Sequence, residues 1–253
     1  MIEQTKQMIY KMRLYGMLST MDQRLSEATA NGWGHAEFLS SVMTDETQHR
    51  DNLRVKSRLR AAQFRIQANL ERFDTTAKRS ITRTQIQDLA AMKWVAQPRN
   101  ILLFGPTGVG KTYLATALGH DACQKGFTCL FLGMNVLIEK LRMARLDGTF
   151  LRLRDKLVKC DVLILDDLGI KRLPPETVQD LYDIMEERYQ SKATIITSQL
   201  PVANWSEVIE DPVAMEAIVD RLVHGAIALD LTGESYRKRR HRNEEIDKPI
   251  ESH

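Results

Sequence analysis

A glycine-rich stretch, set between an apolar run and a helical pattern, constrains this chain more than any other part of it. The pattern GxxxxGK(S/T) is matched at every fixed position by Gly105-Pro106-Thr107-Gly108-Val109-Gly110-Lys111-Thr112. Residues 100–104, just before it, form an apolar run of strand length, and a helical pattern covers residues 113–124. A strand, a glycine loop and a helix in this order are the setting that gives the pattern structural meaning.

The residue types in this loop suit the binding of phosphate groups. Glycines let the backbone approach phosphate oxygens without a Cβ in the way, so that successive N–H groups point at them. The helix that follows adds its positive end. Lys111 can reach the β- and γ-phosphates, the Thr112 hydroxyl can ligate Mg²⁺, and Tyr113 continues the expected site. The alternative is a chance glycine-rich turn, but the full pattern in this setting predicts a protein that binds a nucleoside triphosphate with Mg²⁺.

Length and composition indicate a globular chain of the cytoplasm. A chain of 253 residues suits one large domain, or a core domain with a small appendage. No apolar run approaches the ~20 residues that a membrane span needs, and no long hydrophobic region follows the N-terminus as in a secretory signal. Cys123, Cys129 and Cys160 form no CxxC pair, which argues against a disulfide framework or a zinc site and fits a reducing compartment.

Positive charge is concentrated in the N-terminal part. Residues 1–100 carry 16 Lys or Arg against 10 Asp or Glu, whereas the remainder carries 20 against 23. A basic part joined to a near-neutral nucleotide-binding part suggests a polyanionic partner, above all nucleic acid. A solvated basic helix face is the alternative.

The chain divides into two expected domains. In residues 1–65 apolar side chains recur near the helical period, with a break at Gly16 and a turn signal at 31–34, so a small all-helical domain is expected there. Residues 66–253 are expected to form the ATPase domain, with a basic C-terminal tail. Further strand candidates in that domain lie at 129–134, 162–167, 193–198 and 226–231. Helical patterns separate them, which predicts an α/β fold with a parallel five-stranded sheet flanked by helices.

Two carboxylates end one of the buried strands. Residues 162–165 are continuously apolar, and Asp166 and Asp167 follow directly. This is the form of a Walker B element, in which Asp166 holds Mg²⁺ and Asp167 orients the attacking water or takes its proton. The alternative is a buried strand that ends in two solvated acids.

Further polar groups are candidates for the same site. The strand at 193–198 ends in Thr197-Ser198-Gln199, which can hydrogen-bond the γ-phosphate or its water. Arg221 and Arg237 carry guanidinium groups, which stay charged and bridge phosphate oxygens in two-point fashion. Taken alone, either arginine reads as an ordinary surface residue.

Together these pieces resemble the AAA+ ATPases, and specifically the clade of bacterial helicase loaders (DnaC-like) and insertion-sequence helper ATPases (IstB-like). The resemblance to IstB-like proteins is the closer one and spans nearly the whole chain. It is carried by Met12-Arg13-Leu14-Tyr15-Gly16-Met17, Leu70-Glu71-Arg72-Phe73-Asp74, residues 100–106, Asp166-Asp167-Leu168-Gly169, Thr197-Ser198-Gln199, Asp220-Arg221-Leu222 and Gly233-Glu234-Ser235-Tyr236-Arg237.

The resemblance implies a helper protein for a transposase. Such a protein binds ATP, forms a homo-oligomer on duplex DNA without strong sequence preference, and recruits or stimulates the transposase there. Gln199 stands at the sensor I position, where Asn is usual. Arg221 matches an arginine finger supplied to a neighbouring subunit, Arg237 matches the sensor II arginine, and Phe73 lies where relatives place an adenine-pocket segment. Asp167 replaces the Glu of many AAA+ proteins, and its shorter side chain implies slow hydrolysis.

Three basic groups are candidates for contact with DNA. The first includes Arg50, Arg54, Arg58 and Arg65, whose spacing of four, four and seven puts them on one helix face, together with Lys56 and Arg60. The second contains Lys140, Arg142, Arg145, Arg152, Arg154 and Lys156, in a region that the resemblance places facing the DNA. The third is the run at 237–242. Few aromatic residues interleave them, which favours phosphate contact over base stacking; for each group a merely solvated face is the alternative.

Two other functions are compatible with the same nucleotide-binding motifs. A replicative helicase loader of the DnaC type shares the ATPase motifs, so only the N-terminal domain and its partner separate it from a transposition helper. A small-molecule kinase also uses a P-loop, but it needs an acceptor pocket, and Asp166-Asp167 suits water as the acceptor better.

Overall fold

The computed structural model describes residues 2–75, 80–233 and 235. The chain falls into two compact units, of which the first ends at Arg58 and the second begins at Leu59. This division lies within a long helix, a few residues before the expected boundary at residue 65. In the described part of the chain no helix is long and apolar enough to cross a membrane.

The first unit is helical, as the sequence predicts. It contains α1 (Ile2–Lys11), α2 (Tyr15–Asn31) and the greater part of α3 (His35–Ala62). α2 ends at Gly32, which has a left-handed backbone with φ of 67°, so the turn signal at 31–34 is confirmed. α3 ends at Ala62, and Arg65 therefore does not share the helix face of Arg50, Arg54 and Arg58, which corrects that expectation.

Gly16 does not break the helix as its sequence context suggested. The chain turns just before it, at Arg13, whose φ is 58°, and Gly16 is buried in the first turn of α2. A Cβ at residue 16 would lie 2.7 Å from the backbone oxygen of Asp45 and 2.7 Å from the Cα of Glu46. Glycine is present because α2 and α3 approach each other too closely for a side chain.

The Glu46 carboxylate fixes this helix contact. It accepts hydrogen bonds from the backbone N–H of Gly16 at 2.8 Å and of Met17 at 3.2 Å, and it pairs with Arg50 at 2.6 Å. The first N–H groups of a helix have no partner within the helix. A carboxylate from α3 therefore caps α2.

The second unit is built on five parallel strands, as expected. They are β1 (Ile101–Phe104), β2 (Cys129–Gly133), β3 (Val162–Leu168), β4 (Ala193–Ser198) and β5 (Ile227–Asp230), in the spatial order β2-β3-β4-β1-β5. Each lies within a residue or two of its predicted position. Since β1 and β3 both border β4, their carboxyl ends and that of β4 converge at one edge of the sheet.

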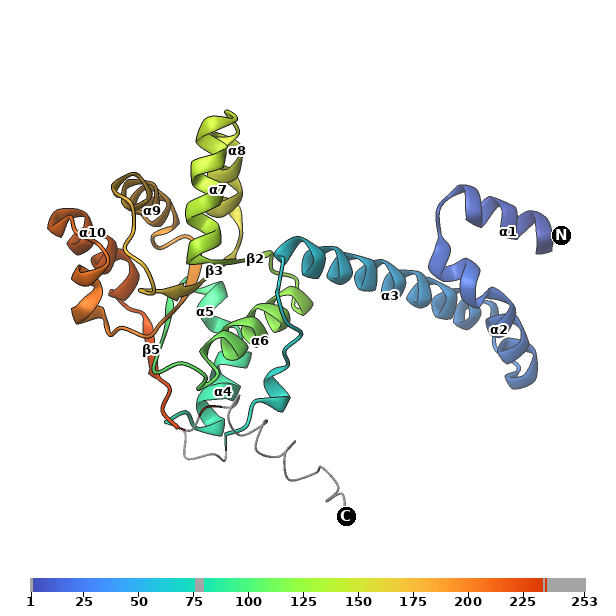
Figure 1. Ribbon diagram of the computed structural model, residues 1–253. Coiled ribbons are helices and arrows are strands. Elements are labelled where there is room, and N and C mark those ends of the chain that lie inside the picture. The colour runs from blue at the N-terminus through green and yellow to red at the C-terminus, as the bar shows by residue number, and fades with distance from the viewer. Residues whose placement is uncertain (1, 76–79, 234, 236–253) are drawn as a thin grey trace, which may run out of the picture. The chain divides into compact units, whose positions relative to one another are not determined.

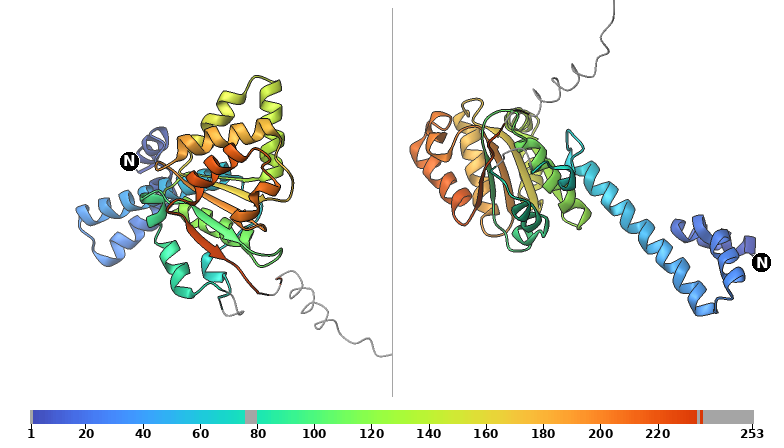
Figure 2. Two further views of the ribbon diagram at one scale, coloured as in Figure 1. Left: turned by 90° about the vertical axis from the view of Figure 1, so that its left-hand side faces the viewer. Right: turned by 90° about the horizontal axis from the view of Figure 1, so that it is seen from below.

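Helices cover both faces of this sheet (Figures 1 and 2). Their bounds are α4 (Arg83–Ala90), α5 (Lys93–Ala96), α6 (Lys111–Gln124), α7 (Met134–Leu146), α8 (Phe150–Lys159), α9 (Pro175–Arg188) and α10 (Pro212–Val223), with short 3₁₀ helices η1 (Leu70–Arg72) and η2 (Val202–Glu207). Alternate strand residues face opposite layers: Ile101 and Leu103 pack with α4, α5 and α6, whereas Leu102 packs with the layer of α7 to α10.

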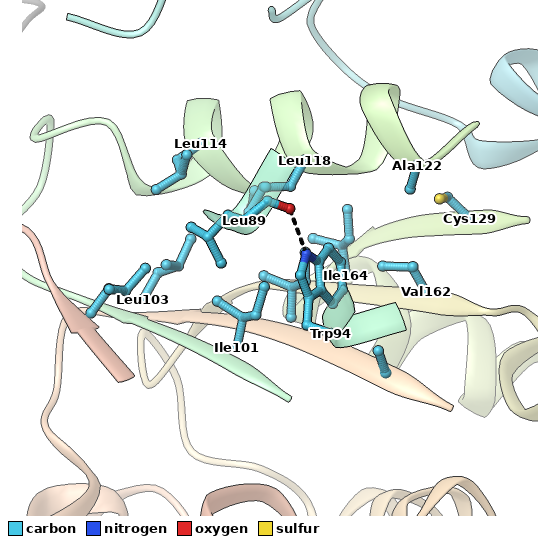
Figure 3. Packing of buried hydrophobic residues seen from close by; sticks show 14 of the residues in the cluster. Leu89, Trp94, Ile101, Leu103, Leu114, Leu118, Ala122, Cys129, Val162 and Ile164 are labelled. Atoms are coloured by element: carbon cyan, nitrogen blue, oxygen red, sulfur yellow. Dashed lines mark hydrogen bonds between the residues drawn. The ribbon is translucent and has the colours of Figure 1, made fainter. Parts of the chain in front are cut away.

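Figure 3 shows the core between α6 and the sheet. Leu114 and Leu118 of α6 pack toward Ile101 and Leu103 of β1, and all four are fully buried. The indole N–H of Trp94 donates to the Leu89 carbonyl at 2.9 Å, so the one polar atom of this buried ring has a partner. α6 is thereby fixed on the sheet, and its first turn is fixed beside the strand ends.

Replacing Glu46 by Ala should loosen the first unit. A hydrogen bond to a charged group contributes about 1.5–3 kcal/mol, and this carboxylate accepts two from α2. The Glu46→Ala protein should therefore exchange the amide hydrogens of residues 16 and 17 at least about tenfold faster, measured by hydrogen exchange on the full chain. Asp51→Ala, which removes an exposed carboxylate of the same helix, is the control. Unchanged exchange in the Glu46 variant would contradict the capping role.

Candidate active site

The glycine loop joins β1 to α6 in the conformation that its sequence predicts. Gly105, Gly108 and Gly110 have φ values of 131°, 88° and 102°, which residues with a Cβ rarely adopt. A Cβ on Gly105 would lie 2.1 Å from the carbonyl oxygen of Leu231. α6 begins at Lys111, so its N-terminal turn opens onto the loop.

The side chain of Lys111, the first residue of α6, bonds back to the loop. Its side chain is buried, and its ammonium donates to the carbonyl oxygens of Gly105 at 2.6 Å and Pro106 at 2.9 Å. Burial lowers the pKa of Lys111, while the negative charges of Asp167 and Asp166 act against this effect. A cation held among carbonyl groups at the start of a helix suits a ligand that carries several negative charges.

Asp166 forms the centre of a hydrogen-bond network at the carboxyl edge of the sheet. It is only 3% exposed, and it accepts from the Thr112 hydroxyl at 2.9 Å and from the Thr197 hydroxyl at 2.6 Å. The Thr197 hydroxyl in turn accepts the backbone N–H of Asp167 at 2.9 Å. Burial raises the pKa of the Asp166 carboxyl, the Thr197 hydroxyl lowers it, and the charge of Asp167 raises it further. The predicted Walker A and Walker B residues are thus brought together.

These oxygens fit a magnesium ion that also binds phosphate. The Thr112 hydroxyl and the Asp166 carboxylate are adjacent hard oxygen donors, the kind that Mg²⁺ prefers. In the described part of the chain no group of three or more His, Cys, Asp or Glu side chains could hold a metal. Mg²⁺ is ordinarily bound by one or two protein oxygens together with substrate phosphates and water, so this donor set suits it.

A cavity of about 660 Å³ opens over the loop. Asp167 and Gln199 lie in its wall together with residues of the glycine loop. Two further lining residues, Ile66 and Arg72, come from the segment that leads into the core, and sequence reasoning did not find them. The complete lining is Ile66, Arg72, Thr107, Gly108, Gly110, Lys111, Thr112, Tyr113, Asp167, Ile170 and Gln199.

Tyr113 connects the cavity to the segment that precedes the core. Its hydroxyl donates to the carbonyl oxygen of Asn69 at 3.2 Å and accepts the Asn69 N–H at 3.3 Å. Phe73 is buried, and its ring lies 6.2 Å from that of Tyr113. It packs behind Tyr113, while Ile66 and Arg72 line the cavity. The sequence did contain a signal for Arg72, because this residue belongs to the segment 70–74, which is one of those that carry the family resemblance.

Arg65 lies near the edge of the site. The nearest guanidinium nitrogen would be 3.0 Å from a Cβ at residue 133, so Gly133 leaves room for this side chain at the end of β2. Gly133 is the register partner of Asp166. Arg65 is accordingly among the charges that lower the pKa of Asp166. It belongs to the second unit of the chain.

Arg221 lies far from its own glycine loop. The side chain of Asn100, at the start of β1, donates to the carbonyl oxygen of Arg221 at 3.0 Å, whereas the loop follows the other end of that strand. The guanidinium group pairs with Glu186. Arg237 is outside the described residues. Ser235, two residues earlier, is next to the loop, because a Cβ on Gly108 would lie 2.2 Å from its hydroxyl oxygen.

The candidate DNA-binding residues differ in whether their side chains pair with carboxylates. In α3, Arg50 pairs with Glu46 and Arg54 pairs with Asp51 at 2.9 Å, while Arg58 is partly exposed on the same helix. In α7, Lys140 is 3.4 Å from the Gln63 side chain and Arg142 is 3.7 Å from Glu139. Arg145 pairs with the buried Asp180, and its guanidinium lies 4.3 Å from the centre of the Phe150 ring. The run at 237–242 is outside the described residues.

Comparison with known proteins identifies the family. Residues 7–244 match the IstB-like ATP binding proteins. The chain belongs to this family. An insertion sequence ATP-binding protein of Sinorhizobium fredii is 39% identical over 231 residues, which cover 91% of this chain and 94% of that protein. The family match identifies the chain as an ATP-binding protein.

Solved structures of lower identity share the fold. The DnaC helicase loader superposes with a TM-score of 0.54 at 23% identity, covering 65% of this chain and 97% of that chain. The replication initiator DnaA, bound to AMPPCP and single-stranded DNA, gives 0.58 at 17%, covering 75% and 58%. The IstB-like protein therefore has the expected AAA+ P-loop core.

Replacing Lys111 by Ala should remove ATP binding. The loop would lose its one buried cation, and a charge-assisted hydrogen bond contributes about 1.5–3 kcal/mol, so affinity should fall by at least about tenfold. Titration with a fluorescent ATP analogue measures this. Lys125→Ala, at the far end of α6, should bind normally. Equal affinity in the two variants would place the nucleotide elsewhere.

Proposed function

We propose that this IstB-like protein hydrolyses ATP, assembles as a homo-oligomer on duplex DNA and recruits or stimulates the transposase of its insertion sequence. The hydrogen-bond network around Asp166 is the observation that carries the proposal, because it joins the glycine loop to a paired-acid strand end at the mouth of one cavity. We place the protein in the cytoplasm. Related chains are insertion sequence ATP-binding proteins by name, which supports the role in transposition.

The roles of the chain's own residues follow from their positions. The loop N–H groups and Lys111 bind the phosphates, and Thr112 and Asp166 would hold Mg²⁺, which would neutralise negative charge on the phosphates. Asp167 orients the attacking water or takes its proton, and the Gln199 amide contacts the γ-phosphate or that water. The Asp167 side chain is shorter than the Glu of many AAA+ proteins, and the expected turnover is slow.

The position of Arg221 supports an oligomer. It is tied to the start of β1, and a strand of four residues spans about 13 Å before the glycine loop begins. It therefore lies at the opposite end of the sheet from its own phosphates. An arginine finger supplied by a neighbouring subunit raises hydrolysis by about 10³–10⁵ in GTPases, and Arg221 suits that role in a second copy.

DNA contact rests on cations at two places. Arg58 of α3, and Lys140 and Arg142 of α7, have exposed or partly exposed side chains. Arg50 and Arg54 on the face of Arg58, and Arg145 on α7, complete the proposed set, although all three also pair with carboxylates. Phosphate contact by such side chains carries no sequence information, as a protein with broad target choice needs.

A helicase loader is the second candidate. Its support is the fold shared with the DnaC helicase loader. The insertion sequence protein matches more of this chain and at higher identity, which favours the transposition helper. Retention of a replicative helicase rather than the transposase, in a pull-down with the purified chain, would reverse this preference.

Duplex binding tests the proposal directly. With a non-hydrolysable ATP analogue the protein should retain duplex DNA of any sequence, and log affinity should fall linearly with log salt. Arg142→Ala should reduce that salt slope by about one, while Arg172→Ala, which removes an exposed arginine paired with Glu210, should leave it unchanged. Equal affinity for duplex DNA with and without the ATP analogue would count against ATP-dependent assembly.

Asp167→Asn should separate ATP binding from hydrolysis. The amide keeps the size of the side chain but cannot accept a proton from water, and general-base catalysis contributes about 10²–10⁴ in rate. Analogue affinity should remain, phosphate release should fall within that range, and assemblies on DNA should last longer. Asp183→Asn on α9 is the control. Normal phosphate release from the Asp167 variant would show that another residue activates the attacking water.

A further inference from the structure

The side chain of Arg221 is held by two residues of α9. Its Nε donates to the Glu186 carboxylate, and its guanidinium carbon lies 5.6 Å from the centre of the Tyr182 ring. These two residues are four apart and therefore lie on one face of the helix. One terminal nitrogen, Nη1, is 3.4 Å from the Ala217 carbonyl oxygen and 3.5 Å from the Asp220 carboxylate, both on α10 itself. Within the described part of the chain, the other terminal nitrogen, Nη2, makes no hydrogen bond.

The backbone at Arg221 is also held. Asn100 donates to the carbonyl oxygens of Arg221 and Leu222 at 3.0 and 3.1 Å, and its own oxygen accepts the N–H of Thr194 at 3.0 Å. One amide side chain thus joins the end of α10 to β1 and β4. The base of the arginine is anchored to the sheet. The direction of the guanidinium depends on Glu186 of α9, which holds Nε, and on the two longer α10 contacts of Nη1.

We propose that Glu186 positions Arg221 for the triphosphate bound by a neighbouring subunit. This inference rests on the proposed function, in which Arg221 acts in trans. Arginine has many rotamers, and holding it in one beforehand reduces the entropy lost on contact with phosphate. Glu186 engages Nε, which leaves the Nη2 side of the fork for a phosphate oxygen. The Tyr182 ring supports the flat guanidinium from one side.

The neighbouring residue Glu187 provides a matched control. It pairs with Arg154 of α8 and is 43% exposed, close to the 47% of Glu186. Exposed ion pairs of this kind contribute little to stability. Loss of either carboxylate should leave the fold intact, whereas only loss of Glu186 should affect hydrolysis in an adjacent subunit.

Mixed oligomers isolate the finger from the ATP site of the same chain. Lys111→Ala subunits lack the ammonium group that binds the phosphates but can supply Arg221, and Arg221→Ala subunits bind ATP but supply no finger. Mixed on duplex DNA, the two should restore hydrolysis. The test introduces Glu186→Ala, Glu186→Gln or Glu187→Ala into the Lys111→Ala chain, so that every change lies in the supplying subunit alone, and measures kcat and KM for ATP.

The Glu186→Ala supplier should lower kcat by about tenfold with KM for ATP unchanged. Glu186→Gln, which keeps one acceptor for Nε, should be intermediate, and Glu187→Ala should equal the Lys111→Ala supplier. If the Ala variant does not assemble on DNA, the Gln variant serves for the same comparison. If the simple Lys111→Ala supplier joins the assembly on DNA and restores nothing, the finger in trans fails, and this inference with it. If that supplier works and the Glu186 variants match or exceed it, the positioning role alone is overturned.

Discussion

The candidate nucleotide site depends on one buried carboxylate, Asp166, and on the two hydroxyl groups that donate hydrogen bonds to it. A carboxylate removed from water is unfavourable unless hydrogen bonds or a cation replace its hydration. Thr112 supplies one such bond from α6 and Thr197 the other from β4. These contacts exist because β4 lies between β1 and β3, which brings the ends of all three strands to one edge. Strand order and site chemistry are therefore two aspects of the same constraint.

In the proposed mechanism the two ends of the sheet differ in function: one binds the nucleotide and the other supplies an arginine to a neighbouring subunit. The carboxyl end holds the phosphate-binding loop and the paired acids, whereas the start of β1 is joined through Asn100 to the arginine on α10. One subunit thus receives nucleotide at one end and supplies a cation from the other. A copy that lines up with another in the same orientation completes a site that neither contains alone, which is why assembly and hydrolysis are expected to depend on each other.

Sequence patterns predicted the fold and the centre of the site because both depend on local signals. Buried parallel strands are continuous apolar runs, and the glycine loop has a fixed spacing, so β1 to β5 and the residues from Gly105 to Thr112 were found. Contacts between distant segments leave no such signal. Arg188 resembles any arginine at a helix end, yet it is 1% exposed and donates to the carbonyls of Leu157 and Cys160. Gly16 and Arg65 were misplaced for the same reason, since their partners lie in other elements.

The backbone at Asp167 accounts for a short acid at this position. Its φ is 63°, and the pairing of β3 with β4 is irregular between Leu165 and Leu168. Left-handed backbone is unfavourable for most side chains, but Asp and Asn tolerate it because their short polar groups bond locally. The Thr197 hydroxyl accepts the Asp167 N–H and holds this conformation. A longer Glu would reach further toward water but fit this backbone less well. The backbone that places the Asp167 carboxylate in the cavity wall therefore favours a short acid, which in the proposed mechanism is the slower catalyst.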